Sequence, residues 1–317
     1  MRPSSLVLAV LPCLLAGCQS STTTPDPSAS ARRVQPAVAP KAAPPNATFY
    51  EIRYHKGPIM TGPVNVYFIW YGNWAGNTAP TILSDFMADL GGEPYNNMNT
   101  SFYDSHNNHI ANSVTFWGGI DDHYSRGNNL GDLDVPFIVD TAISNGRLPA
   151  DANGVYFVLA SADVHQFGKQ SFCTKTECGW HDHTQSGGRD IKYAFVGNPD
   201  QCPSQCNMVD NRGNPTNVTN SPNGNPGADS VARAISHELV EAENDPDGNA
   251  WYADGTQGFE SADHCQGKWG TTTTLPNGAL ANVVIGDRNF LLQQQMVVVN
   301  TNQFACTAPC GYCDLSL

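Results

Sequence analysis

The sequence predicts an α+β fold with a mixed sheet, in one domain that follows an export signal and a linker. Residues 64–71 are β-branched and aromatic, as in a buried strand, and apolar residues from 80 to 90 recur with helical spacing. Only 14% of residues are charged, and 29 Gly and 22 Pro indicate a loop-rich exported protein. With 317 residues, 40% of them hydrophobic, the chain is long enough to bury a large core.

The N-terminus, residues 1–17, has the features of an export signal. Its apolar run, Leu6 to Leu15, is too short to span a membrane. Residues 15–18 read Leu-Ala-Gly-Cys, which looks like a bacterial lipoprotein signal whose cleavage leaves Cys18 to carry lipid. The alternative is an ordinary signal peptide with an incidental cysteine. Because Gln19 rather than Asp follows Cys18, we expect a cell-envelope protein, either an outer-membrane lipoprotein tethered through its lipid or a secreted protein.

Residues 18–48 are expected to form the lipidated cysteine and a linker. Between residues 19 and 46 the chain has six Pro, six Ala, seven Ser or Thr and no aromatic residue, which is the composition of an unstructured spacer. The folded domain is therefore expected to occupy residues 49–317.

Local patterns predict the remaining elements of this domain. Pro80 and Gly91-Gly92 mark the ends of the first helix, and Gly72 to Asn77 form the turn before it. Residues 198–227 are expected to form a long loop. Further strands are predicted at 113–117, 155–160, 191–196 and 295–300, and a second helix at 137–145. This mixture of strands and helices, closed by short strands, favours one α+β domain.

Eight cysteines of the domain, an even number, favour disulfides in an exported protein. The alternative is a structural zinc site, because Cys310-x-x-Cys313 has the spacing of zinc ligands. Short-range closure favours pairing within 173–178 and within 202–206, and a further pair between residues 265 and 306. The eight candidates are Cys173, Cys178, Cys202, Cys206, Cys265, Cys306, Cys310 and Cys313.

The most informative motif is His237-Glu238-Leu239-Val240-Glu241, for which a shuffled chain offers about 0.004 occurrences. It lies in a predicted helix, 229–243, with Asp229 as its cap and Asn244-Asp245-Pro246 as its stop. His237 and Glu241 are four residues apart, so they share a helix face on which one metal ion fits. Glu238 lies about 100° further round the helix, beside the apolar face formed by Val231, Ile235, Leu239 and Ala242.

This motif resembles the zinc-peptidase helix H-E-x-x-H, with Glu241 in place of the second histidine. Zinc accepts a carboxylate oxygen, but the exchange weakens its Lewis acidity and admits harder ions. We therefore expect Zn²⁺, with another divalent cation as the alternative. A purely structural interpretation also stays open, in which His237 and Glu241 form an exposed pair worth about 0.3 kcal/mol.

Glu260 and Asp263 follow the motif at a suggestive interval. In thermolysin-like peptidases the third ligand is a Glu at about this distance, on a helix that also offers an Asp to hold a ligand histidine. The resemblance implies a zincin-like domain with an active-site-type helix, with Glu260 as the third ligand and Asp263 as the residue that hydrogen-bonds the ligand histidine. Glu238 would act as the catalytic base, and Tyr252 or His264 would help the oxyanion. An ordinary helix start also accounts for a Glu and an Asp this close together.

Weaker metal candidates are expected to have other roles. The segment Asp245 to Asn249 fails as a calcium loop, because Ala250 and Thr256 stand where Gly and Glu are needed, so a turn is expected. His181-Asp182-His183, and likewise His106 with His109, are expected at the surface or in packing roles. A net charge of -13 argues against nucleic acid as a partner.

Several segments resemble the Exordium or phosphate-induced protein family of plants and bacteria. The likeness covers nearly all of residues 49–316 and includes Tyr54 to Pro58, Val64 to Gly72, Phe172 to His181, Val196 to Cys206, Ser236 to Tyr252 and Glu260 to Gly270. The resemblance implies secretion without an established catalytic activity, and the plant pattern generally lacks the His-Glu-x-x-Glu residues.

Two functions are therefore predicted from the sequence. The first is an exported, lipid-anchored protein with a divalent-metal site, as a zinc-dependent peptidase acting on peptides or a degenerate relative of one. The alternative is a non-catalytic cell-surface protein of the Exordium type that binds a surface ligand or signals.

Overall fold

The computed structural model describes residues 52–168, 171–173, 178–206, 216–217, 219–254, 256–300 and 303–307. The predicted signal peptide and linker, with Cys18, lie outside the described residues, as do Cys310 and Cys313. No helix within the described ranges is both long and apolar enough to cross a bilayer.

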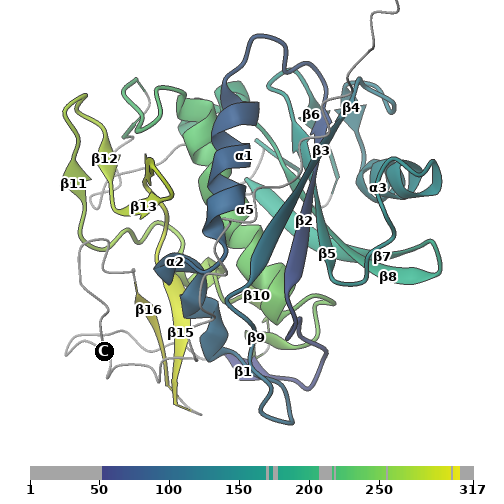
Figure 1. Ribbon diagram of the computed structural model, residues 1–317, viewed down its shortest axis with the longest axis vertical. Helices are drawn as coiled ribbons and strands as arrows, with labels where there is room; N and C mark the ends of the chain where they lie inside the picture. Colours follow the sequence, from purple (N-terminus) through teal and green to yellow (C-terminus); the bar gives the residue numbers. More distant parts are fainter. Residues whose placement is uncertain are drawn as a thin grey trace, which may run out of the picture. The chain divides into compact units, whose positions relative to one another are not determined.

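A five-stranded mixed sheet forms the centre of the fold, as the sequence predicts (Figure 1). Its order is β3 (Val114–Asp122), β2 (Val64–Tyr71), β5 (Gly154–Ala160), β8 (Arg189–Val196) and β7 (Gly179–Ser186). The first four strands are parallel, and β7 pairs antiparallel with β8 at one edge. β2 and β5 are almost wholly buried because both faces of the sheet are covered, which explains their continuous apolar runs.

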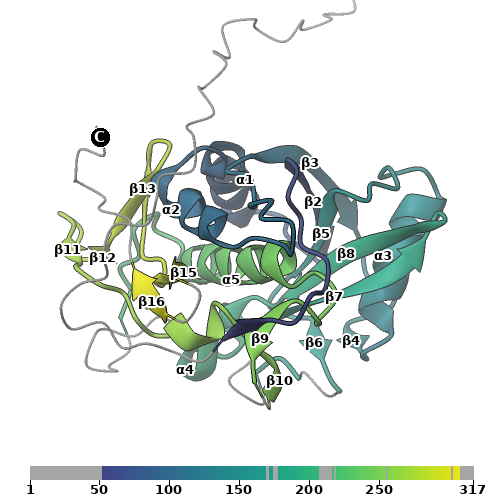
Figure 2. The same ribbon diagram turned by 90° about the horizontal axis from the view of Figure 1, so that it is seen from below.

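Helices cover the two faces of this sheet. Figure 2 shows α1 (Ala79–Leu90) and α5 (Pro226–Asn244) on one face and α3 (Asp134–Ser144) on the other. The predicted first helix and all the predicted strands are present, with ends shifted by up to five residues, and the second predicted helix begins three residues earlier than expected. The structure therefore confirms the mixed α and β architecture.

Helix α5 begins earlier than the sequence pattern indicates. Its cap is Asn225, whose side chain accepts a hydrogen bond from the Ala228 N–H, and Pro226 occupies the first turn. Asp229 is therefore not the cap. Its carboxylate is buried in the first turn and accepts hydrogen bonds from the backbone and the side chain of Asn223. The helix ends at Asn244, as expected.

Strand β7 was not predicted from the sequence, and two of the predicted disulfide pairings are wrong for this reason. The expected bridges within 173–178 and within 202–206 are replaced by Cys173–Cys202 and Cys178–Cys206. β7 and β8 form an antiparallel hairpin, so the segments before β7 and after β8 meet at its open end. The 198–227 region accordingly holds η2 (Pro199–Gln201) and α4 (Pro203–Cys206) at its start and the first residues of α5 at its end, where a continuous loop was expected.

The third predicted bridge, Cys265–Cys306, is confirmed. It joins η3 (Asp263–Cys265) to β16 (Gln303–Thr307), which pairs with β15 (Gln295–Asn300). A second small sheet contains β1 (Arg53–Tyr54), β9 (Trp251–Ala253) and β10 (Thr256–Glu260). Glu260 thus ends a strand and Asp263 begins a single 3₁₀ turn, where a helix carrying both residues was expected.

The other short elements lie between these parts. They are α2 (Pro94–Asn97), η1 (Met98–Ser101), β4 (Asn129–Leu130), β6 (His165–Gln166), β11 (Thr273–Thr274), β12 (Leu280–Ala281), β13 (Val283–Ile285) and β14 (Arg288–Phe290).

Candidate metal centre

The motif residues of α5 are buried in the described structure. His237 is 7% exposed, Glu238 4% and Glu241 3%, so the structure rejects the interpretation of an exposed surface pair. Burying ionised groups is costly unless they are paired or bind a cation. The partners of these three side chains therefore define what the site can do.

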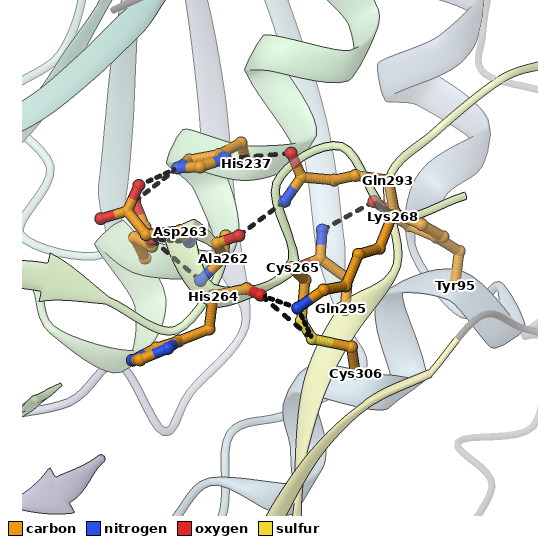
Figure 3. The surroundings of a disulfide bond; sticks show 11 residues. Tyr95, His237, Ala262, Asp263, His264, Cys265, Lys268, Gln293, Gln295 and Cys306 are labelled. Carbon is orange, nitrogen blue, oxygen red and sulfur yellow. Dashed lines mark hydrogen bonds and ion pairs between the residues drawn. A yellow bond between two sulfur atoms is a disulfide. The ribbon is translucent and has the colours of Figure 1, made fainter. Parts of the chain in front are cut away.

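His237, Glu241 and Asp263 form a first group of donor atoms. Nε2 of His237 lies 3.1 Å from Oε2 of Glu241 and 3.3 Å from Oδ1 of Asp263. Figure 3 shows the carboxylate of Asp263 turned toward the imidazole of His237. The other carboxylate oxygen of Glu241, Oε1, accepts hydrogen bonds from the backbone N–H groups of Ala262, at 2.9 Å, and Asp263, at 3.2 Å. Asp263 thus contacts Nε2 of His237, the atom that was expected to face a metal, rather than supporting the imidazole from its other side.

Gln293 takes the supporting role instead. Its Oε1 accepts a hydrogen bond from Nδ1 of His237 at 3.1 Å, and its Nε2 donates to the Ala262 carbonyl at 2.9 Å (Figure 3). This bond fixes the tautomer of His237 so that Nε2 is directed at the carboxylates. The sequence gives no local signal that Gln293 contacts His237, because Gln293 lies 56 residues further along the chain and belongs to no recognisable motif.

His181, Glu241 and Glu260 form a second group. Nε2 of His181 lies 3.2 and 3.1 Å from the two carboxylate oxygens of Glu260, and the His181 side chain is 6% exposed. The imidazole comes from β7, on the face of the sheet that α5 covers, and Glu260 comes from the end of β10. From the sequence, His181 is a weak metal candidate that is expected at the surface or in a packing role. The structure instead places it in one cluster with His237, Glu241, Glu260 and Asp263.

Glu238 borders the opening of the cluster. With Arg233, His237 and Asp263 it lines a pocket of about 20 Å³, which has room for about one water molecule or ion. Its carboxylate lies against Gly179 of β7, where an added Cβ would approach Oε1 of Glu238 to 2.8 Å. The guanidinium of Arg233 is buried, and its Nε has no hydrogen-bond partner among the described residues.

The charges of these groups perturb one another strongly. Burial raises the pKa of Glu238 and that of Glu260 to about 8. Burial alone would lower the pKa of His181, but the adjacent Glu260 outweighs it and raises that pKa to about 10. The pKa of His237 likewise rises well above its ordinary value because of Glu241 and Asp263. Without a cation, the cluster therefore retains protons that a bound cation would displace.

The two residues expected to stabilise an oxyanion have other contacts. The ring of Tyr252 stacks on His55 with centroids 3.6 Å apart. The imidazole of His264 packs against Phe259 and points away from His237 in Figure 3. Neither residue belongs to a donor group within the described part of the chain.

The remaining candidates have the ordinary roles expected of them. The imidazole of His109 bonds to the Thr100 carbonyl, and His106 is exposed. Asp245 accepts a hydrogen bond from the Ala250 N–H, as expected for a turn.

A third histidine–carboxylate group differs from the first two because it already contains a cation. His183 faces Asp190 and Asp247, and the ammonium of Lys192 contacts both carboxylates. Lys192 thus supplies a positive charge to both carboxylates of this group.

Comparison with known proteins identifies the family. The protein-family model described as "Phosphate-induced protein 1 conserved region" matches residues 52–289. This range includes His181, His237, Glu241, Glu260 and Asp263.

The curated relatives agree with this match. "Protein EXORDIUM-like 5" of Arabidopsis thaliana is 30% identical over 83% of this chain and 79% of its own length. "Protein EXORDIUM-like 3" of the same plant is 30% identical over 85% of each chain. "Protein PHOSPHATE-INDUCED 1" of Nicotiana tabacum is 27% identical over 68% of this chain and 72% of its own length. No solved structure matches the chain. The chain therefore belongs to the phosphate-induced protein 1 family, which includes the Exordium proteins.

Proposed function

We propose that this chain is an exported Exordium-type protein of the cell envelope whose buried histidine–carboxylate cluster binds a divalent cation, with zinc as the first candidate. In this proposal Cys18 carries lipid, and the protein acts at the surface through binding rather than catalysis. Its membership of the Exordium family supports the non-catalytic role.

The observation that carries the cation proposal is a group of buried carboxylates and imidazoles without an adequate number of cationic side chains in the described structure. Four carboxylates surround two imidazoles, and no lysine or arginine forms an ion pair with them in the described ranges. Such a cluster is unfavourable by itself, and a divalent cation offsets the repulsion while using the oxygen and nitrogen atoms as ligands. The carboxylates are those of Glu238, Glu241, Glu260 and Asp263.

The donor set influences which ion is bound. Two imidazole nitrogens suit zinc, whereas a majority of carboxylate oxygens also suits harder ions such as Mn²⁺. The cation would tie β7, α5 and the segment after β10 together, a structural role that needs no substrate.

Peptide hydrolysis is a second candidate, favoured by the position of Glu238. A bound divalent cation would supply an acidified water, and Glu238 lines the same pocket as His237, where it would accept a proton. β7 is an edge strand to which an extended peptide could add. The pocket itself holds about one water molecule, so a substrate would have to open it.

Elemental analysis of protein purified without chelator tests the proposal. We expect tightly bound metal in the wild type, less metal in His237→Asn, and loss of the metal in Glu241→Gln. Glu243→Gln is the matched control, because Glu243 is buried in the same helix but bonds to Asn99 outside the cluster. Metal-free wild type, or equal metal in all four proteins, would refute the cation site.

Glu238→Gln separates the two functions. Both candidates predict that it retains the metal. Turnover of a mixture of unstructured peptides by the zinc-loaded wild type, lost in Glu238→Gln, would favour the peptidase. Equal background rates in the two proteins would favour the non-catalytic role.

A further inference from the structure

Glu241 belongs to two separate groups of donor atoms. One group contains His181 and Glu260, and the other contains His237 and Asp263. Within each group the donor atoms lie within 4.8 Å of one another, and the two imidazoles do not share a group in the described part of the chain.

These spacings suit two ions better than one. Ligands of a single ion lie about 2.0–2.2 Å from it, so two of them are at most about 4.4 Å apart. Each group could close round one ion with small shifts. No group in the described structure contains both imidazoles, so one ion held by both would need a larger rearrangement than one ion in each group.

The charge of the region points the same way. A fifth carboxylate, that of Asp245, is fully buried, interacts electrostatically with Glu260, and has an oxygen without a hydrogen-bond partner in the described structure. In the protonation state that ligands need, with every carboxylate ionised and both imidazoles neutral, five carboxylates and the guanidinium of Arg233 leave four negative charges. One divalent cation would neutralise half of this surplus, and two would neutralise all of it.

We propose that the cluster binds two divalent cations bridged by the carboxylate of Glu241, one held with His181 and Glu260 and the other with His237 and Asp263. This inference rests on the proposed cation-binding function. It adds the number of ions, the bridging ligand and a ligand histidine from the sheet. Shared carboxylates are typical of two-metal sites, in which the ions lie about 3.5–4 Å apart.

Glu241 is suited to bridge because its carboxylate is held in place. The N–H groups of Ala262 and Asp263 occupy one oxygen, which leaves the second oxygen, the one that faces His237, as the atom that both ions would share. The His183 group provides the contrast, since the ammonium of Lys192 already contacts both of its carboxylates.

Titration with Mn²⁺ tests the inference, with electron paramagnetic resonance used to count the free ion and to report on coupling between bound ions. The full chain is first stripped with a chelator. We expect two equivalents in the wild type, with a spectrum broadened by spin coupling. His181→Asn and His237→Asn should each bind one equivalent and show the spectrum of isolated ions. His183→Asn should match the wild type.

The outcomes distinguish this inference from the function on which it rests. One equivalent in wild-type protein would overturn the two-ion site and leave the single-cation proposal standing. No bound Mn²⁺, together with no zinc in the purified protein, would refute both. Two coupled equivalents in His181→Asn would also overturn the inference. Circular dichroism of each variant ensures that the comparison is made between folded proteins.

Discussion

At the scale of single residues, the orientation of His237 depends on a side chain that is not a ligand. The hydrogen bond from Nδ1 to Gln293 leaves Nε2 to face Glu241 and Asp263. Gln293 also satisfies the carbonyl of Ala262, whose N–H contacts Glu241. A single amide therefore holds both sides of the first donor group.

Gln293→Leu should lower metal affinity about 10–100-fold, because the imidazole loses the acceptor that fixes its tautomer. It should also destabilise the fold by about 1–3 kcal/mol, since the Ala262 carbonyl would be buried without a partner. Competition with a zinc indicator and urea unfolding measure the two effects.

Gln295→Leu is the matched control for this substitution. Gln295 is buried nearby but donates to the Tyr95 hydroxyl and does not touch His237 (Figure 3). We expect it to reduce stability without changing metal affinity. Equal affinity losses in both variants would contradict the positioning role of Gln293.

At the scale of elements, the helices and strands that carry their own hydrophobic pattern could be predicted from the sequence. β2 and α1 were predicted because their apolar residues follow the period of a strand or a helix. β7 has Trp180 as its large apolar residue and is otherwise mostly polar, because it is an edge strand with one half-covered face. Its pairing with β8 stabilises it, and pairing leaves no local signal.

The residues of the candidate site could likewise be predicted only where a local pattern brings them together. His237 and Glu241 share a helix face, so their spacing gave their proximity. His181 was undervalued because the missing strand β7 carries it into the cluster. Asp263 was given a supporting role by analogy with a helix that is absent here, since Glu260 ends β10 and the chain then turns over α5.

The hairpin of β7 and β8 makes a testable prediction about the disulfides. Peptide mapping under non-reducing conditions should find the cross-links Cys173–Cys202 and Cys178–Cys206. The double variant Cys178→Ala with Cys206→Ala should lose about 3–4 kcal/mol of unfolding free energy, because a bridge spanning 28 residues restricts the unfolded chain. Cross-links within 173–178 or within 202–206 would refute this hairpin.

At the scale of the whole molecule, the cluster joins segments that are far apart in the sequence. His181 comes from the sheet edge, His237 and Glu241 from α5, and Glu260 and Asp263 from the segment that follows β9. A cation held by all three parts would stabilise the folded state, because the unfolded chain does not bring these ligands together.

Chelation should therefore lower the melting temperature of the wild type, and zinc should restore it. At a free zinc concentration of 100 times Kd, the expected stabilisation is about 2.7 kcal/mol. Differential scanning calorimetry measures the shift. Glu241→Gln should melt at the same temperature with and without zinc, and a shift equal to that of the wild type would show that zinc acts elsewhere.

The predicted anchor is also tested on the whole chain. Cys18→Ala should release the protein from membranes into the soluble fraction, because the substitution removes the residue that carries the lipid. The released domain should melt as the wild type does, since Cys18 lies outside the family match of residues 52–289. A variant that stays with the membrane would contradict the lipoprotein prediction.

Diffraction at the zinc absorption edge, from crystals of the protein grown with Zn²⁺, tests the central claim most directly. We expect an anomalous difference peak about 2.0–2.2 Å from Nε2 of His237 and in contact with the carboxylate of Glu241. Peaks confined to surface groups such as His183 with Asp190, with none beside His237, would contradict the cation site.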